Sequence, residues 1–137
     1  RLALESLEAR DAARRVCVGA FGEPAIRWLR AQRAGVATWA TRAEVVRFLR
    51  YDALRIGGLA RIGADAFSVP ERSGRRVVVT PRRVRALTRR GLPVHVWTVD
   101  EETTIRRLLG MGVTGLVTDR PDLAVPLVSG RAPARGP

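Results

Sequence analysis

The chain has 137 residues, of which 46% are hydrophobic and 28% are charged. This length suits a single domain, and the composition is typical of a globular rather than a disordered protein. No run approaches the roughly eighteen apolar residues of a membrane-spanning helix, so we expect no transmembrane segment. Residues 1–5 contain neither a methionine nor a signal-like apolar stretch, so we expect the chain to be internal to a longer polypeptide. The compartment stays open, with a cytoplasmic location favoured.

The net charge is +12, and all 25 basic residues are arginines. A strong positive field could bind a polyanion such as nucleic acid, whereas charges spread over solvated helix faces need no such partner. The arginines are scattered along the chain. Only the segment from Arg72 to Arg90 is locally dense, and it lacks the interleaved aromatic residues that stack on bases. We therefore predict solvated arginines and no nucleic-acid partner.

The first forty residues predict two helices and two strands. Residues 1–15 have apolar side chains at helical spacing. The run RVCVGAF, residues 15–21, predicts a short strand. A second helix is expected to begin near Pro24, since proline is favoured in the first turn, and Gly35 is expected to break it. The run VATWA, residues 36–40, predicts a short buried strand.

The clearest helix is expected to begin after Thr41, because Thr41 and Glu44 have the spacing of a capping box. Its predicted apolar stripe consists of residues one turn apart, Val45, Leu49, Ala53 and Ile56. Gly57-Gly58 is expected to end this helix. A further strand is predicted over ADAFSVP, residues 64–70.

Residues 71–79 are polar at first and end in three valines, which predicts a loop with a short extra strand at its end. Thr80-Pro81 is an N-cap followed by a first-turn proline. The helix that it begins is expected to run to Arg90, with Gly91 as the C-cap.

The last part of the chain predicts two more strand-helix pairs. Residues 94–99 form the first strand, and Asp100 is expected to cap the helix that follows, which glycines end near Gly112. The run TGLVTD, residues 114–119, predicts the last strand, and residues 122–128 a final short helix.

Five predicted strands thus alternate with helical segments through short connections. Such alternation implies an α/β fold with a parallel sheet. The short units favour a barrel over an open doubly wound sheet, and no Gly-x-Gly-x-x-Gly turn follows any strand, as nucleotide binding in the open fold would require. Since five units do not close an eight-stranded barrel, either the sheet is open or the first three units are missing.

The catalytic inventory is short, with one histidine, His95, one cysteine, Cys17, and no lysine. Single residues of these two types exclude a zinc or iron site of the histidine–cysteine kind, and no carboxylates cluster at metal-ligand spacing. Without lysine there is no phosphate-binding P-loop. We therefore expect no catalytic and no metal-binding residue in this chain, and we interpret Cys17 as a small core residue.

The strand over residues 94–99 has two different faces, because alternate side chains point to opposite sides. Val94 and Val96 form an apolar face that suits packing under helices, so His95 and Trp97 are expected to point into the barrel. Trp97 would lie near the carboxyl-terminal mouth, where it either forms an apolar wall of a substrate pocket or plugs the barrel, and we favour the wall. His95, one layer deeper, is interpreted as a core histidine.

The stretch GLPVHVWTVDEETTIRRLLGMGVTGLVTDRPD, residues 91–122, resembles the carboxyl-terminal signature of the glycerophosphodiester phosphodiesterase family. That signature reads Gly-x-x-Val-x-Val-Trp-Thr-Val-Asn/Asp, then a helix, then Gly-Val-Asp-Gly-Ile-x-Thr-Asp-x-Pro. Weaker similarity reaches back over RVCVGAF and ADAFSVP, so that it covers nearly all of residues 15–127. The resemblance implies a TIM (β/α)8 barrel that hydrolyses a glycerophosphodiester, with a divalent metal (Mg or Ca), to an alcohol and glycerol 3-phosphate.

The chain also departs from the family. The family's catalytic histidines, metal-binding carboxylates and basic phosphate ligand belong to motifs of the first three strands, which have no counterpart here. Ala20 stands where the family has serine, and Thr114 where it has aspartate. The resemblance implies that Trp97 belongs to the substrate pocket and that Phe21 forms part of the pocket wall. Residues 119–121, Asp-Arg-Pro, are interpreted as ending the last strand and turning the chain into the final helix.

Residues 1–128 are therefore interpreted as the C-terminal portion of such a barrel, about five parallel βα units that correspond to strands four to eight. Residues 129–137, rich in Gly, Pro and Arg, are predicted to be a disordered tail. The full-length parent is expected to be a phosphoric diester hydrolase with a small-molecule glycerophosphodiester substrate and a divalent metal. This chain alone is expected to bind no metal and to be inactive. The alternative is a non-enzymatic binding or interaction module derived from the same barrel. The oligomeric state stays open.

Overall fold

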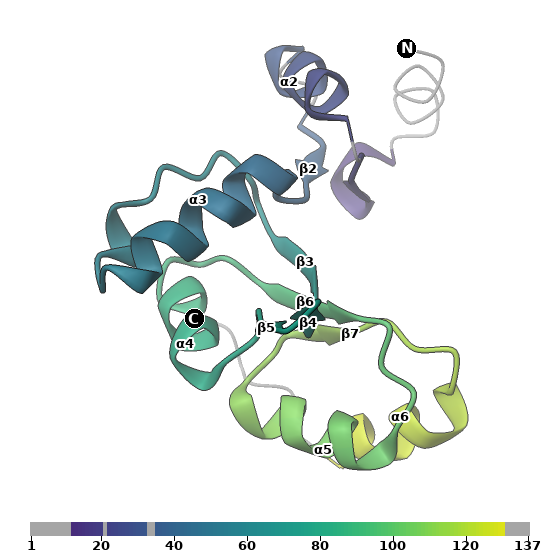
Figure 1. Cartoon of the computed structure of the whole chain (residues 1–137). Coiled ribbons are helices and arrows are strands. Elements are labelled where there is room, and N and C mark those ends of the chain that lie inside the picture. Colours follow the sequence, from purple (N-terminus) through teal and green to yellow (C-terminus); the bar gives the residue numbers. More distant parts are fainter. Residues whose placement is uncertain (1–11, 21, 33–34, 131–137) are drawn as a thin grey trace. The chain divides into compact units, whose positions relative to one another are not determined.

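The computed structural model describes residues 12–20, 22–32 and 35–130. The chain divides into two compact units, Arg1–Phe67 and Ser68–Pro137, and the division falls inside strand β3 (Phe67–Pro70). Helices alternate with strands along both units (Figure 1), which confirms the predicted α/β class.

The first unit consists of short elements: the 3-10 helices η1 (Ala13–Arg15) and η2 (Gly57–Leu59), strands β1 (Cys17–Val18) and β2 (Ala37–Thr38), and helices α2 (Glu23–Ala31) and α3 (Arg42–Ala53). Strands β1 and β2 pair in parallel, with Cys17 opposite Ala37. Trp39 continues β2 through a parallel bridge to Ala66, just before β3. The strands predicted for this unit are therefore confirmed, although each is shorter than its apolar run.

Cys17 lies half-buried in β1. Burial, together with the nearby charge of Asp65, raises the pKa of its thiol. A raised pKa disfavours the nucleophilic thiolate, which agrees with the interpretation of Cys17 as a core residue.

Helix α3 begins as predicted. The Glu44 N–H donates to Thr41 Oγ1 at 3.3 Å, and the Thr41 N–H donates to Glu44 Oε2 at 2.8 Å. Both halves of the capping box are therefore present, and two amides that a helix start leaves free are satisfied.

The predicted apolar stripe of α3 is wrong. Its buried residues are Glu44, Phe48 and Asp52, whereas Val45 and Leu49 are half-buried and Ala53 and Ile56 are exposed. The physical reason is that the Glu44 carboxylate is held by hydrogen bonds from Arg30 and Gly63 and can therefore be buried. A pattern of apolar residues cannot predict a buried helix face that contains carboxylates.

The second unit contains the rest of β3, strands β4 (Arg72–Ser73), β5 (Arg76–Val77), β6 (Val94–Trp97) and β7 (Gly115–Leu116), and helices α4 (Pro81–Thr88), α5 (Glu102–Met111) and α6 (Pro121–Ser129). The strand order of its main sheet is β3-β6-β7, and β6 and β7 pair in parallel. As predicted, Thr80 caps α4, and its hydroxyl oxygen accepts from the Arg83 N–H at 3.3 Å. The helix stops at Thr88, two residues before its expected end, and Gly91 then takes a left-handed φ of 71°.

The polar segment after β3 is a hairpin rather than a loop with one added strand. Strands β4 and β5 pair antiparallel, with Arg72 opposite Val77, and the chain turns at Gly74, whose φ is 58°. The Arg83 guanidinium donates to the Val77 carbonyl at 2.6 Å, which ties the hairpin to α4.

The core of the second unit confirms the predicted outer face of β6. Val94 and Val96 are at most 2% exposed, and the apolar side chains buried with them come from α4 and α5 (Val84, Leu87, Ile105 and Leu108). Burial of this face fixes which side chains of β6 point the other way.

Two predictions fall largely outside the described residues. Of the predicted first helix, residues 1–15, only the end is described, and there Ala13–Arg15 form η1. Of the predicted tail, residues 129–137, Ser129 ends α6 and Gly130 is the last described residue. Among the described residues, no helix has the length and apolar character needed to cross a membrane.

Candidate functional site

The carboxyl ends of parallel strands are where ligands bind in barrels and in open α/β sheets. Strands β6 and β7 end side by side in the second unit, because His95 pairs with Gly115 and Val96 with Leu116. Val117 then lies opposite Trp97, since the Val117 N–H donates to the Val96 carbonyl at 2.9 Å. The peptide bond after Trp97 is cis.

An exposed apolar pair marks these strand ends. Trp97 is 39% exposed and Val117 is 49% exposed, in contrast to the buried valines of the opposite face. Both belong to the face that also carries His95 and Gly115. Together with Asp100, Thr118 and Asp119 from the loops that follow, we call this the carboxyl-end surface.

His95 lies one layer below Trp97 and is half-buried. Its ring occupies the space that a side chain at position 115 would need: a Cβ on Gly115 would lie 2.7 Å from His95 Cδ2. Burial lowers the pKa of His95 below its usual value, because it disfavours the charged imidazolium. A half-buried ring packed against the backbone of the neighbouring strand agrees with the predicted core role. Gly115 was missed by the sequence reasoning, although a glycine inside a predicted strand signals a close approach.

Asp100 connects the two loops of the carboxyl-end surface. Its Oδ1 accepts from the Thr118 hydroxyl at 3.0 Å and from the Asp119 N–H at 2.8 Å. The prediction that Asp100 caps α5 is therefore wrong; the N-cap is Glu101, without a side-chain hydrogen bond. The carboxylate instead satisfies the donors of the loop after β7. The sequence does contain a signal for this contact: Asp100 follows one strand, and the pair Thr118-Asp119 follows the neighbouring strand.

The loop after β7 turns the chain into α6 as predicted. The Arg120 N–H donates to Thr118 Oγ1 at 2.9 Å, and Pro121 opens the helix. The Arg120 guanidinium pairs with Asp122 at 2.8 Å and lowers the pKa of that carboxyl. These contacts join residues of one turn and support its structural role.

Thr114, which stands where the sequence resemblance implies an aspartate, also has a structural place. Its hydroxyl accepts from the Val94 N–H at 2.7 Å and donates to the Val94 carbonyl at 3.0 Å. This pair of bonds extends the β6–β7 ladder by one position.

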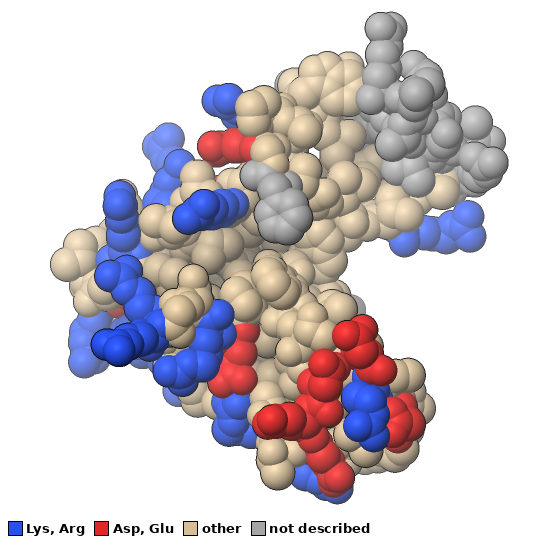
Figure 2. All heavy atoms as spheres, turned by 45° about the vertical axis from the view of Figure 1, so that its right-hand side comes forward, with Lys and Arg blue, Asp and Glu red and all other residues tan. Residues whose placement is uncertain are grey.

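Acidic side chains gather on part of the surface, with a basic side chain among them (Figure 2). Exposed acidic residues follow the ends of β6 and β7: Asp100, Glu101, Glu102, Asp119 and Asp122. Even so, no three His, Cys, Asp or Glu side chains within the described ranges are placed to hold a metal ion. Glu71, which follows β3, is paired with Arg107 of α5 at 2.9 Å. The described residues therefore do not fit a divalent-metal cage.

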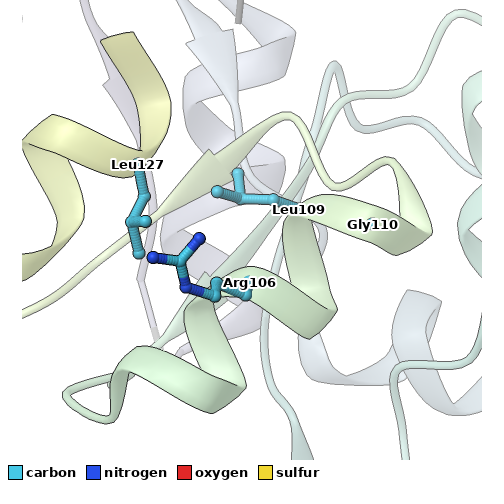
Figure 3. Close-up of a pocket in the computed structure, with 4 residues that line it drawn as sticks. All are labelled: Arg106, Leu109, Gly110 and Leu127. Atoms are coloured by element: carbon cyan, nitrogen blue, oxygen red, sulfur yellow. The ribbon is translucent and has the colours of Figure 1, made fainter. Parts of the chain in front are cut away.

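A shallow hollow lies between α5 and α6 (Figure 3). None of its lining residues belongs to the carboxyl-end surface. The hollow is lined by Arg106, Leu109, Gly110 and Leu127. Since α5 starts after the end of β6 and ends before the start of β7, its second half lies toward the opposite ends of the strands. Arg106 is engaged there by Glu102 at 2.7 Å.

The first unit has its own strand ends. Phe21, the second predicted substrate residue, lies outside the described residues. Two residues before Phe21, the absence of a side chain at Gly19 leaves room for the Trp39 ring. A Cβ at position 19 would lie 2.7 Å from Trp39 Cδ1. Trp39 was not singled out from the sequence, and it packs where β1 and β2 end.

Known proteins resemble this chain in both sequence and fold. Residues 26–123 match the model of the glycerophosphoryl diester phosphodiesterase family. A stretch of 59 residues is 48% identical to "Probable glycerophosphodiester phosphodiesterase 2" of Mycobacterium tuberculosis (strain ATCC 25618 / H37Rv), which covers 43% of this chain and 22% of that protein.

Two solved structures share the fold. A glycerophosphodiester phosphodiesterase from Parabacteroides distasonis ATCC 8503 superimposes with a TM-score of 0.71 over 96% of this chain and 50% of its own, at 17% identity. A protein of Silicibacter pomeroyi DSS-3, assigned to the glycerophosphoryl diester phosphodiesterases, gives a TM-score of 0.69 over 93% of this chain and 42% of its own, at 23% identity. The chain thus spans half or less of the length of the relatives it matches. Because the family model covers well over half of its residues, the chain belongs to the glycerophosphoryl diester phosphodiesterase family.

Proposed function

We propose that the protein containing this chain is a phosphoric diester hydrolase, which converts a glycerophosphodiester and water into an alcohol and glycerol 3-phosphate. The family match, which includes the strand that carries Trp97, supports this assignment. In this proposal the five parallel strand-helix units correspond to strands four to eight of a TIM barrel, and residues 1–128 make up this portion.

Trp97 is proposed as an apolar wall of the substrate pocket. Its exposed ring lies at the strand ends beside Val117, where it would contact the carbon atoms of the glycerol or alcohol group and exclude water. Phe21 is proposed as a second part of that wall on the strength of the family resemblance. Neither side chain makes or breaks a bond in the reaction.

The family's resemblance implies a divalent metal, Mg or Ca, that would polarise the phosphate. Since the described residues do not fit such an ion, we assign it no ligand in this chain. The described residues are assigned to binding and to the support of the pocket: His95 fills the layer under Trp97, and Asp100 fixes the two loops beside it.

The test is release of glycerol 3-phosphate from glycerophosphocholine, with added magnesium or calcium. The protein purified from its natural source is expected to show turnover that a chelator abolishes. Absence of turnover with both metals and several head groups would favour a non-enzymatic binding module.

The isolated 137-residue chain provides a second, independent readout. Because it supplies no described metal cage and no catalytic histidine pair, we predict no turnover with either metal. Metal-dependent hydrolysis by the pure chain would refute the assignment to strands four to eight.

A further inference from the structure

The connection between α3 and β3 exposes large apolar side chains. Leu54 and Leu59 are each 71% exposed, and Ile56 is 42% exposed. The chain reverses direction here, after the end of α3 (Figure 1). We call residues 50–61 the α3–β3 turn.

The fold of this turn does not depend on its leucines. The Ile56 N–H donates to the Tyr51 carbonyl at 2.9 Å, and the Leu59 N–H donates to the Ile56 carbonyl at 2.9 Å. Gly57 is buried, and a Cβ there would lie 3.3 Å from the Phe48 ring and 3.4 Å from Asp52. The turn is therefore seated by its backbone and by Gly57, while the two leucines point away from the packed part.

Positive charge surrounds these leucines. Arg47, Arg50, Arg55 and Arg61 are exposed on the last turns of α3 and on the α3–β3 turn. The only carboxylate of the turn, Asp52, is 3% exposed. The Arg47 guanidinium donates to the Arg61 carbonyl at 3.0 Å, which keeps these two arginines together. The exposed surface of the turn thus offers cations and apolar tips, with no exposed acidic group in residues 50–61.

The pattern of the turn identifies the kind of partner. An anionic surface would complement these cations, and two separated, protruding leucines fit a medium that accepts single side chains without a preformed cavity. A nucleic-acid backbone provides the anions but no apolar medium, whereas the boundary of headgroups and acyl chains in an anionic lipid surface provides both. We propose that the α3–β3 turn docks the protein on an anionic lipid surface, with Leu54 and Leu59 inserted and Arg50, Arg55 and Arg61 against the lipid phosphates. This proposal is independent of the proposed hydrolase activity.

The test is co-sedimentation of the natural protein with vesicles of phosphatidylcholine alone, or of an equimolar mixture with phosphatidylglycerol. We expect binding to the anionic vesicles only, and about a tenfold or greater loss of affinity in Leu54→Ser/Leu59→Ser. The matched control is Val125→Ser/Val128→Ser on α6, which removes apolar side chains that are 60% and 47% exposed and should leave binding unchanged. Both pairs are exposed, so thermal melts should stay close to that of the wild type.

A charge series keeps the proposal testable should the leucine variant unfold. Arg50→Gln/Arg55→Gln/Arg61→Gln should lose affinity about tenfold or more. It should lose more than Arg75→Gln/Arg85→Gln/Arg89→Gln, which removes the same charge from the hairpin, from α4 and from the C-cap of α4. Equal losses in the two arginine variants, or unchanged binding by a folded leucine variant, would overturn the proposal. Absence of vesicle binding would also overturn the proposal. Self-association in sedimentation, or binding of duplex DNA in place of vesicles, would then identify a different role for the turn.

Discussion

The packing of β6 against β7 requires that position 115 has no side chain. The His95 ring on the neighbouring strand lies where a Cβ would be, with Cγ and Nε2 each 2.8 Å from the ideal Cβ position. A ring held by a strand cannot move aside freely, so a methyl group here would force β6 and β7 apart. The histidine and the glycine therefore form one structural pair, one layer below Trp97 on the same face of the strands.

We predict that Gly115→Ala destabilises the protein by about 2 kcal/mol, because the added methyl group overpacks this site. Gly110→Ala is the control: a Cβ at this position in α5 has no neighbour within 4 Å, and alanine should stabilise the helix by about 0.5–1 kcal/mol. Urea unfolding curves measure both. Shortening the histidine in the background of Gly115→Ala should recover part of the loss, and equal effects of the two glycine variants would contradict the pairing.

Helix α3 shows how an element can be held by polar groups. The Arg30 guanidinium of α2 pairs with Glu44 at 3.0 Å, and the Gly63 N–H donates to the same carboxylate at 2.7 Å. The Arg30 side chain also donates to Thr38 Oγ1 at 2.9 Å. One buried carboxylate thus links α2, α3, β2 and the segment before β3, and no apolar contact could satisfy these donors.

The pKa of Glu44 determines when this link is lost. Burial by itself raises the pKa, but the hydrogen bonds from Arg30, Thr41 and Gly63 outweigh burial and hold it below the usual value. Because the folded pKa is lower than the unfolded one, the carboxylate stabilises the fold above the unfolded pKa. That contribution is lost as the pH falls through the folded pKa.

We predict that Glu44→Gln costs about 3 kcal/mol at neutral pH, since it leaves Arg30 part-buried without its partner. The difference from the wild type should shrink in acid, where Glu44 is protonated. Glu102→Gln in the exposed pair with Arg106 should cost less than about 1 kcal/mol at any pH. Thermal unfolding over a pH series measures this; an equal cost for both variants would argue against a structural role of the buried pair.

The elements differ in how far the sequence predicts them. The strands near Cys17, Thr38, Val69, Val96 and Leu116 follow from their apolar runs, and the starts of α3 and α4 follow from cap residues whose chemistry is local. The buried face of α3 does not follow, because burial of Glu44 depends on an arginine fourteen positions away. Nor does the role of Asp100, whose partners belong to a loop eighteen positions later. The position of Trp97, by contrast, follows from the sequence. Side chains alternate between the two faces of a strand, and this rule needs no contact with a distant part of the chain.

At the scale of the whole molecule, the behaviour of the isolated chain tests the proposed partial barrel. The described main sheet has β7 at one end of its strand order, and its face with Trp97 and Val117 is partly exposed. Unpaired strand edges and exposed apolar surface favour association. We predict that the isolated 137-residue chain is aggregated, dimeric or partly molten. Sedimentation velocity and calorimetry decide this, and a monodisperse, cooperatively unfolding monomer would count against a barrel portion.

The most direct measurement is steady-state kinetics of Trp97→Ala in the natural protein, with His95→Asn as its companion. If Trp97 is a substrate wall, its loss should lower kcat/KM by about one to two orders of magnitude, or about 1.4–2.7 kcal/mol of transition-state binding, in a protein of unchanged melting temperature. His95→Asn should mainly lower the melting temperature, because the ring fills the layer against Gly115. Unchanged kinetics for Trp97→Ala, together with abolished turnover in a still-folded His95→Asn, would contradict the account and assign the chemistry to the histidine.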